Sequence, residues 1–516
     1  MKYLIGIDLG SSAIKVGLFD TKGILHSIIR ETYSLEFPRN GWVDIPVGRW
    51  WSILKNMISN LVIKDNIQTK DIVGIGISNF CPSLVLIDKK RNILRPVINF
   101  MDQRSQKQLD NLKKIVDENE FYKITGNGLN LGSCSLISLL WVKENEPNVY
   151  HEIDYIGHLN TYICELMTKN IGIDYTNASM TGLFDTVNKQ KWSKDLCDLF
   201  EISPDILPPL YRSGDKIGNL TKIAAAELNL KEGIPVAIGA ADTACSALAL
   251  NLQTEKEIFE SAGTSDVLTF CLGSPKKLDK RFVNRLHIVP DFWLCHGSMS
   301  TSGATLKWLK NGLYKFEEII MEEYKESVYS LMSEDASKAL PGSGGVIFLP
   351  YMMGERTPIW DGDARGVFFG LSLSTTKQDI IRAIMEGNAF GLKQIIDIIE
   401  SEFSICVSKI KAVGGCTESE ISTQIKSDIL NKTIMTMNMK ETALTGAALL
   451  GGIAGGVFKD YQEAMECRSL ETRYSKKPIT ENKKLYEELY QIYNGLYPLI
   501  KNEYKTLSNF RKKYYK

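Results

Sequence analysis

The chain has 516 residues, of which 44% are hydrophobic and 24% are charged, and 61 Lys and Arg residues balance 61 Asp and Glu residues. This composition is typical of a globular protein with more than one domain, because most domains contain about 100–200 residues. A balanced charge gives no global field that would recruit nucleic acid or a membrane surface, so we expect neither as a partner.

Cysteine usage and the N-terminus favour a cytoplasmic protein. Ten cysteines are scattered without a CxxC pair, and five histidines offer little for a zinc site. The apolar run after Met1 reaches Asp8 within a few residues, which leaves no hydrophobic region for a signal peptide. The glycine-rich stretch 443–458 is shorter than the ~18 apolar residues that indicate a membrane span.

The N-terminal half reads as a mixture of strands and helices. Residues 3–9 and the alternating apolar residues from Ile14 to Leu18 predict two strands joined by a small-residue turn at Gly10-Ser11-Ser12. The pattern further predicts a helix at 50–61, a buried strand at 72–78, its continuation at 83–87 after Pro82, a mostly helical region at 102–201 and a strand at 235–238. This is an α/β domain.

A second strand–turn–strand pattern begins near Ile258, in the sequence FESAGTSDVLTFCLG. The repeat of the opening plan after about 250 residues predicts a duplicated fold with two halves facing a cleft. Downstream, apolar residues on one face predict a long helix at 379–400. The polar segment after Lys459 predicts a C-terminal helix and a solvated tail.

The two small-residue turns are candidate phosphate sites. Asp8 ends a buried strand just before Gly10, so a magnesium ion and donating backbone N–H groups could meet there. An ordinary turn capped by Asp8 is the structural alternative. A matching turn at Gly263-Thr264-Ser265 favours phosphate binding, and the absence of GxxxxGK[ST] and of a GxGxxG helix start disfavours P-loop and Rossmann sites.

Two further positions are candidates for ligand contact. Asp242 lies among small residues in GAADTA, where its carboxylate could reach a ligand, although the N-cap of a helix is the structural alternative. Gly414-Gly415 follows an apolar strand and could pass beneath a nucleotide base. Taken alone, the glycine pair is also typical of a plain strand-to-helix turn.

The motifs together resemble the FGGY carbohydrate kinase family, which includes xylulose, glycerol, gluconate and ribulose kinases. The resemblance spans Leu4 to Gly452 and rests on motifs in the family's order. These are GIDLGSSAIK at 6, GAADTA at 239, SAGTSD at 261, FLPYMMGERTP at 348, GVFFGLSLSTTKQDIIRAIMEG at 366, VGGCTESE at 413 and TGAALLGG at 445. The last two resemble the family's adenosine-side motifs.

The resemblance implies an α/β fold with two actin-like (ribonuclease-H-like) domains and with ATP and sugar in the cleft between them. We expect an N-terminal domain at 1–247 on the sugar side, a C-terminal domain at 248–460 on the ATP side, and a helical, solvated extension at 461–516. A small sugar or polyol is the expected partner, with ATP and Mg²⁺ as cosubstrate and metal. A homodimer is one possible assembly.

The resemblance also assigns roles to single residues. Asp242 would be the general base, and Asp8 would hold magnesium through water. The ATP-binding residues would be Gly10, Ser11, Ser12, Lys15, Gly263, Thr264, Ser265, Gly303, Gly414, Gly415, Cys416 and Ser419. The sugar-binding residues would be Trp42, Asp44, Cys81, Asp102, Arg104, Asp242 and Thr243.

Departures from the family pattern leave the sugar open. Phe80-Cys81-Pro82-Ser83 stands where xylulose kinases carry Gln-Met-His-Gly, and Thr243 follows the aspartate as in deoxysugar kinases. Cys416 replaces a glycine, Ser138 a lysine and Thr445 a leucine. We expect a ketopentose such as xylulose, with a deoxyketose, ribulose, gluconate or a polyol as alternatives. A non-catalytic sugar sensor and an actin-like ATPase are the alternatives from other classes.

Overall fold

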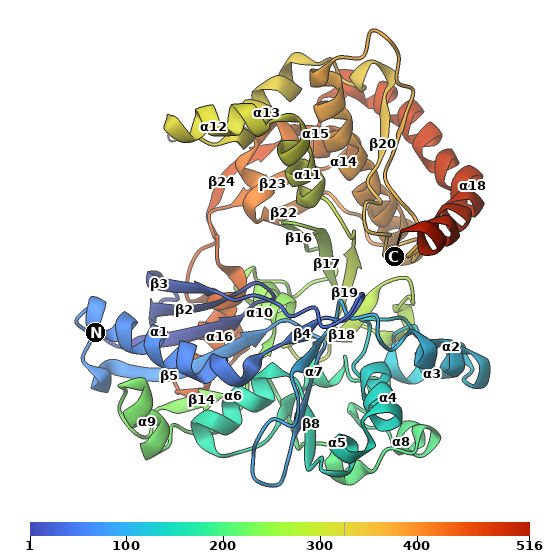
Figure 1. The fold of residues 1–516 in the computed structure, drawn as a ribbon. Coiled ribbons are helices and arrows are strands. Elements are labelled where there is room, and N and C mark those ends of the chain that lie inside the picture. Colours follow the sequence, from blue (N-terminus) through green and yellow to red (C-terminus); the bar gives the residue numbers. More distant parts are fainter. Residues whose placement is uncertain (325, 516) are drawn as a thin grey trace. The chain divides into compact units, whose positions relative to one another are not determined.

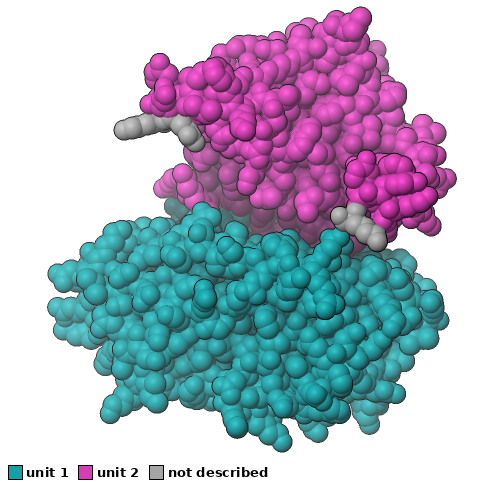
Figure 2. Space-filling model, viewed as in Figure 1, with its two compact units in different colours: residues 1–253, 271–295, 441–469 teal, residues 254–270, 296–440, 470–516 magenta. Residues whose placement is uncertain are grey.

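The computed structural model describes residues 1–324 and 326–515, and the chain forms two compact units (Figures 1 and 2). Unit 1 comprises residues 1–253, 271–295 and 441–469, and unit 2 comprises residues 254–270, 296–440 and 470–516. The chain therefore passes from one unit to the other five times. Among the described residues, no helix combines the length and apolar character that a membrane span requires.

The main sheet of unit 1 contains both strands of the predicted N-terminal hairpin. Its seven strands are β1 (Tyr3–Leu9), β2 (Ala13–Asp20), β3 (Leu25–Thr32), β5 (Ile72–Asn79), β13 (Lys216–Asn219), β14 (Pro235–Ala237) and β15 (Ala240–Ala241). β1 pairs antiparallel with β2 and parallel with β5, and both β14 and β15 pair parallel with β5. The ends of β1, β5 and β15 therefore meet at one edge of the sheet.

Helices cover both faces of this sheet. They are α1 (Trp50–Lys64), α6 (Leu159–Thr168), α9 (Lys222–Leu228), α10 (Asp242–Ala249) and α16 (Thr442–Ala454). Ile5, Ile7 and Leu9 face the core shared with α1, α6 and α9, while the alternate residues face α16. A Cβ on Gly76 would lie 1.8 Å from the Ala447 carbonyl oxygen, so this face needs glycine.

A smaller sheet and several helices complete unit 1. Its strands are β4 (Asp44–Ile45), β6 (Ser83–Ile87), β7 (Val97–Asn99) and β8 (Tyr155–Gly157). The other elements are α2 (Gln106–Ile115), α3 (Glu118–Thr125), α4 (Leu136–Asn145), α5 (Pro147–His151), β9 (Ile173–Asp174), α7 (Tyr175–Ala178), β10 (Phe184–Asp185), β11 (Lys191–Trp192), α8 (Lys194–Phe200), β12 (Leu210–Tyr211), β18 (Val283–Leu286) and α17 (Tyr461–Glu466). β6 follows β5 directly but belongs to this second sheet, so it does not continue β5 as the sequence suggested.

Unit 2 repeats the pairing plan of unit 1. β16 (Ile258–Ala262) pairs antiparallel with β17 (Asp266–Leu272) and parallel with β22 (Lys409–Val413). The other elements are β19 (Trp293–Ser298), α11 (Gly303–Leu313), α12 (Lys315–Glu323), α13 (Val328–Lys338), β20 (Ile347–Leu349), β21 (Val367–Phe369), α14 (Lys377–Glu402), α15 (Glu420–Leu430), β23 (Thr433–Met437), β24 (Thr472–Lys476) and α18 (Lys483–Tyr514).

The C-terminal segment contributes to the core of unit 2. β24 pairs antiparallel with β23, and Tyr486, Tyr490 and Tyr493 of α18 are buried against α14 residues such as Phe390. The sequence predicted a helix with a solvated tail here. The tyrosines recur every three or four residues, which places them on one face of the helix and explains their burial.

Candidate active site

The first predicted phosphate turn begins where β1 ends. Asp8 is buried, whereas Gly10 and Ser11 of the turn are partly exposed and Ser12 is exposed. The Gly10 N–H donates to the Ala13 carbonyl at 3.0 Å, which closes the turn. The Tyr33 hydroxyl also holds the turn, because it donates to the Gly10 carbonyl at 2.7 Å.

Asp8 lies among other charged and polar groups. The Ser78 hydroxyl donates to Asp8 Oδ1 at 3.0 Å, and Lys15 Nζ lies 3.7 Å from Asp8 Oδ2. Burial raises the pKa of Asp8 to about 6, Lys15 lowers it, and the negative charges of Asp242 and Glu441 raise it. A hard cation would relieve this repulsion, and carboxylate oxygens are the ligands that Mg²⁺ prefers. The residues present therefore fit a magnesium ion.

Asp242 is the first residue of α10, and Ala241 holds the N-cap position without a side-chain cap. Asp242 Oδ1 accepts a hydrogen bond from the Thr243 N–H at 2.7 Å. Burial raises the pKa of the Asp242 carboxyl, while the charges of Arg285 and Lys15 lower it. Asp242 therefore does not cap the helix, and the residue is partly exposed.

Helix α7 connects the segments around Asp242. Asp174 caps this helix by accepting from the Thr176 and Asn177 N–H groups at 2.9 and 3.3 Å. Thr176 Oγ1 accepts from the Ala241 N–H at 2.9 Å, so it fixes the residue before Asp242. Asn177 exchanges side-chain hydrogen bonds with Asn79 at the end of β5.

Cys81 lies beside the same helix. Its thiol is 3.3 Å from His158 Nδ1, which is itself 3.0 Å from Asn177 Oδ1. Burial raises the pKa of the Cys81 thiol far above its usual range and lowers the pKa of His158 to about 4. Both side chains are therefore neutral near pH 7 and present polar but uncharged atoms.

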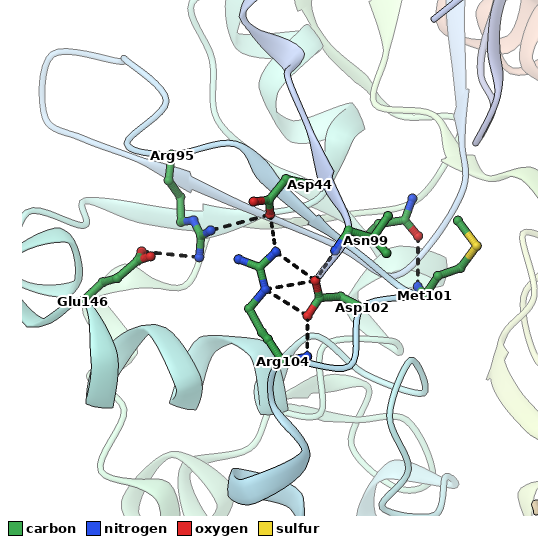
Figure 3. A network of polar contacts seen from close by, with 8 residues as sticks. Asp44, Arg95, Asn99, Met101, Asp102, Arg104 and Glu146 are labelled. Atoms are coloured by element: carbon green, nitrogen blue, oxygen red, sulfur yellow. Dashed lines mark hydrogen bonds and ion pairs between the residues drawn. The ribbon is translucent and has the colours of Figure 1, made fainter. Parts of the chain in front are cut away.

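The predicted sugar-side residues Asp44, Asp102 and Arg104 form one buried network (Figure 3). Arg104 Nη2 lies 2.5 Å from Asp44 Oδ1 and 2.8 Å from Asp102 Oδ2, and its side chain is 0% exposed. Trp42 covers the guanidinium, with its ring centre 4.2 Å from Arg104 Cζ. Arg95 extends the network through Asp44 at 3.6 Å.

The network gives these residues partners within the protein. Asp102 accepts from the Val43 and Arg104 N–H groups, so it joins two distant segments of unit 1. The Arg104 side chain is 0% exposed, and its charge is paired with two carboxylates of the protein. The structure therefore brings Asp44, Asp102 and Arg104 together as a support for neighbouring segments, with only Trp42 partly exposed.

The second predicted phosphate turn lies in unit 2, between β16 and β17. Thr264 is exposed, and Gly263 and Ser265 are partly exposed. The Gly303 N–H donates to the Gly263 carbonyl and the Ser302 N–H to the Thr264 carbonyl, both at 3.0 Å. A Cβ on Gly303 would lie 2.4 Å from the Gly263 carbonyl oxygen, so glycine is needed for this close approach.

The predicted adenosine-side residues adjoin this turn. Gly414 has φ of 104°, and a Cβ there would lie 2.4 Å from the Ala262 carbonyl oxygen. The Cys416 thiol lies 3.4 Å from the Gly263 carbonyl oxygen. Ser419 caps α15 by accepting from the Ser422 N–H at 3.3 Å. Gly414 and Gly415 remain exposed and open to a ligand.

Lys426 of α15 lies beneath the second turn and was not predicted as a site residue. Its ammonium group pairs with Glu260 of β16 and, at 2.7 Å, with Asp266 of β17. All three side chains are buried. No local pattern identifies it, because its neighbours Ser422, Thr423 and Asp428 on α15 are also polar. The lysine joins the two strands that carry the turn.

Arg285 of β18 was also not predicted. It is buried, and its charge acts on Asp242, Cys81 and His158. An arginine inside the apolar strand sequence FVNRLHIV was the signal that could have identified it. The segment TGAALLGG, by contrast, forms α16, whose small residues pack on β1, β5 and α10 of unit 1.

Comparisons with known proteins agree with this architecture. Residues 3–249 match the N-terminal domain and residues 259–455 the C-terminal domain of the FGGY family of carbohydrate kinases. A xylulose kinase of Staphylococcus epidermidis is 30% identical over 96% of this chain and 97% of its own length. A gluconokinase of Bacillus subtilis is 26% identical over 99% of this chain and 98% of its own length.

A solved structure extends the match to the fold. The crystal structure of xylulose kinase from Rhodospirillum rubrum gives a TM-score of 0.86 at 25% identity and covers 98% of this chain and 100% of that chain. The predicted fold class, two domains of mixed α/β structure, and the predicted enzyme class, a phosphotransferase, are confirmed. The chain belongs to the FGGY family of carbohydrate kinases.

Proposed function

We propose that the chain transfers the γ-phosphoryl group of ATP to a hydroxyl of a ketopentose such as xylulose, with Mg²⁺ as the metal. The single observation that carries this proposal is the partly exposed carboxylate of Asp242 at the start of α10, near Asp8 and Lys15. A carboxylate that is held by its neighbours but not consumed by them is suited to accept a proton.

In this reaction, Asp242 accepts the proton of the attacking hydroxyl. Burial raises the pKa of Asp242, which makes the carboxylate more basic, and the charge of Arg285 lowers it. Thr243 lies beside Asp242, and its backbone N–H donates to Asp242 Oδ1 at 2.7 Å. Cys81 supplies a neutral polar contact for the sugar.

Each of the two turns, Gly10-Ser11-Ser12 in unit 1 and Gly263-Thr264-Ser265 in unit 2, offers backbone N–H groups and hydroxyls to phosphate oxygens, and Lys15 offers a further cation in unit 1. Mg²⁺, held through water by Asp8, would neutralise the charge that develops on the phosphates. Phosphoryl transfer needs little covalent chemistry from the protein, so alignment and charge stabilisation supply most of the rate. Gly414, Gly415 and Cys416 would line the adenine base of ATP.

The acceptor is proposed from the relatives and from the pocket. Proteins named xylulose kinase are 30% identical over almost the whole chain. Asp44, Asp102 and Arg104 act as positioning residues, because their network sets the segments beside Trp42. A deoxyketose, ribulose, gluconate or a polyol could also give its hydroxyl proton to Asp242. The panel of substrates described below distinguishes these acceptors.

The test measures ADP release with ATP, Mg²⁺ and a panel of ketopentoses, deoxyketoses, sugar acids and polyols. The proposal expects one ketopentose to give the highest kcat/KM and an acceptor-dependent rise over basal ATP hydrolysis. Release of ADP that no sugar accelerates would indicate an actin-like ATPase. A sugar-dependent thermal shift without turnover would indicate a sensor.

A further inference from the structure

Arg285 is a buried cation that its own protein leaves partly unsatisfied. The residue is 5% exposed, and within the described part of the chain its Nε and Nη1 atoms have no hydrogen-bond partner. Burying a charge without full compensation costs free energy, and fold stability alone gives no reason to retain it. Such a group is a candidate for ligand contact.

The backbone on both sides of Arg285 is fixed. The Asn284 N–H donates to Asn127 Oδ1 at 2.8 Å, and the Leu286 N–H donates to Ser179 Oγ at 3.1 Å. Successive side chains on a strand point to opposite faces, so the Arg285 side chain lies on the face opposite to the side chains of Asn284 and Leu286. Ser179 directly follows α7, the helix that also fixes Ala241 and Asn79.

The guanidinium lies close to the proposed base. Its charge lowers the pKa of Asp242 and of Cys81, in both cases against the larger effect of burial. Arg285, Asp242 and Cys81 thus surround one region of unit 1, built around α7. Pro82, next to Cys81, stands where xylulose kinases carry a histidine, so Arg285 supplies a hydrogen-bond donor where that one is lost.

The chemistry of the guanidinium restricts its partner. It has N–H donors and no acceptor, so the ligand atom beside it must accept. If the ligand atom were a hydroxyl oxygen, its proton would need a hydrogen-bond acceptor of its own. His158 does not offer one, because its ring nitrogens already contact Asn177, Cys81 and Ser135. A ketone or carboxylate oxygen accepts without adding a donor.

We infer that Arg285 binds the acceptor through a carbonyl-type oxygen, the ketone of a ketose or the carboxylate of a sugar acid, next to the hydroxyl that faces Asp242. This inference rests on the proposed function and deepens it. It assigns the protein to acceptors that carry such an oxygen and excludes polyols as preferred substrates.

The experiment compares D-xylulose, xylitol and D-gluconate, because xylitol differs from xylulose by reduction of the ketone. Initial rates and calorimetric binding are measured for the wild type, Arg285→Met, Arg285→Lys and the control Arg281→Met. Arg281 lies four residues earlier, is partly exposed and pairs with Asp279. The wild type should prefer a carbonyl substrate to xylitol by about 10²–10⁴-fold in kcat/KM.

Arg285→Met should remove most of this preference, mainly by raising KM for the carbonyl substrate, while kcat/KM for xylitol changes little. Arg285→Lys should recover part of it, because the ammonium keeps the charge but lacks the planar fork. Preference for xylulose identifies the ketone as the partner, and preference for gluconate identifies the carboxylate. A structural role is tested by melting: removal of an unsatisfied charge should leave Tm unchanged or higher.

Unchanged preference in Arg285→Met, or equal use of xylitol and xylulose by the wild type, would overturn the inference. Binding of a carbonyl compound that depends on Arg285 but leads to no turnover supports the inference and refutes the proposed function. Absence of binding to all three compounds contradicts both. A fall in Tm of several degrees in Arg285→Met would assign the residue a structural role instead.

Discussion

The two strand–turn–strand segments pair in the same way but hold their charges differently. β1 and β16 each pair antiparallel with the next strand and parallel with a later one. Near the first turn, Asp8 is buried with a raised pKa and its nearest cation, Lys15, is partly exposed. Beneath the second turn, Glu260 and Asp266 share the fully buried Lys426.

The difference shows that a duplicated scaffold can be used in two ways. The carboxylates beside the first turn lack full compensation, which suits groups that receive a cation or a proton. The two carboxylates under the second turn share one buried lysine, which joins the strands that carry the turn, while burial and the charge of Asp266 raise the pKa of Glu260 to about 7. Charged residues at equivalent places thus have different roles: those beside the first turn are suited to ligand chemistry, and those under the second turn support the structure.

The largest expected effect is on catalysis beside the first turn. Asp242→Asn removes the proposed base and should lower kcat by about 10²–10⁴-fold, with ATP binding retained. Because burial disfavours the charged carboxylate, the variant should melt no lower than the wild type. Steady-state rates and thermal melting check both parts, and near-normal turnover would refute the role of Asp242.

The second largest expected effect is on the stability of unit 2. Lys426→Met leaves two carboxylates buried without their partner and should cost about 3–5 kcal/mol, measured as a lower denaturant midpoint for unit 2. The matched control is Lys476→Met, whose partner Glu420 is exposed, so that loss should stay below about 1 kcal/mol. Equal effects of the two substitutions would erase the distinction between the two turns.

Near the first turn, Asp8→Asn should raise the free energy of unfolding, whereas Lys426→Met lowers it. The pKa of Asp8 is about 6 in the folded chain and 3.8 in a free carboxyl. Between these values the folded chain holds a proton that the unfolded chain has lost, so this carboxyl makes stability fall as pH rises from about 4 to 6. In magnesium-free buffer, Asp8→Asn should be more stable than the wild type by roughly 1–3 kcal/mol at pH 7 and similar at pH 4.

The control is Asp20→Asn. Backbone N–H groups of Lys22 and Ile24 donate to Asp20, and its pKa is lowered. Its stabilisation is present above the unfolded pKa and lost in acid, so Asp20→Asn should destabilise the chain at pH 7. Denaturant unfolding at the two pH values separates the cases, and a destabilised Asp8→Asn at pH 7 would contradict the raised pKa.

The smallest effect concerns the partly exposed ion pair beside the first turn. Lys15 Nζ lies 2.7 Å from Glu441 Oε2, with both side chains about one-quarter exposed. Glu441→Gln should change the free energy of unfolding by less than about 1 kcal/mol, because solvent screens the pair. Denaturation at low and high salt checks this, and a larger, salt-independent loss would show that the first turn also depends on internal pairing.

Local patterns predicted the parts of the molecule that local patterns control. Alternating apolar residues and the turns at Gly10 and Gly263 predicted both hairpins, and apolar periodicity predicted α1 and α14. Asp242 could be selected because small residues surround it in the sequence. Its exact helix position, N1 in place of N-cap, depends on Ala241 being fixed by Thr176, which no local pattern shows.

The networks could not be predicted, because they join residues that are far apart in the chain. Arg104 meets Asp44 across 60 residues, and Lys426 meets Asp266 across 160. Each of these residues looks like a surface charge in its own segment. Only the folded arrangement shows that they are buried and paired, and that Arg285 is buried with unsatisfied nitrogens.

The glycine-lined packing of α16 on β1 and β5 has a consequence for biosynthesis. Gly6, Gly74 and Gly76 are made early, but Leu444, Ala447 and Gly451, which cover them, leave the ribosome near the end of synthesis. At about 5–20 residues per second the nascent sheet would wait roughly 20–70 s for its cover. A truncated transcript encoding only the first 253 residues should therefore yield an incomplete, chaperone-dependent product, although those residues form most of unit 1.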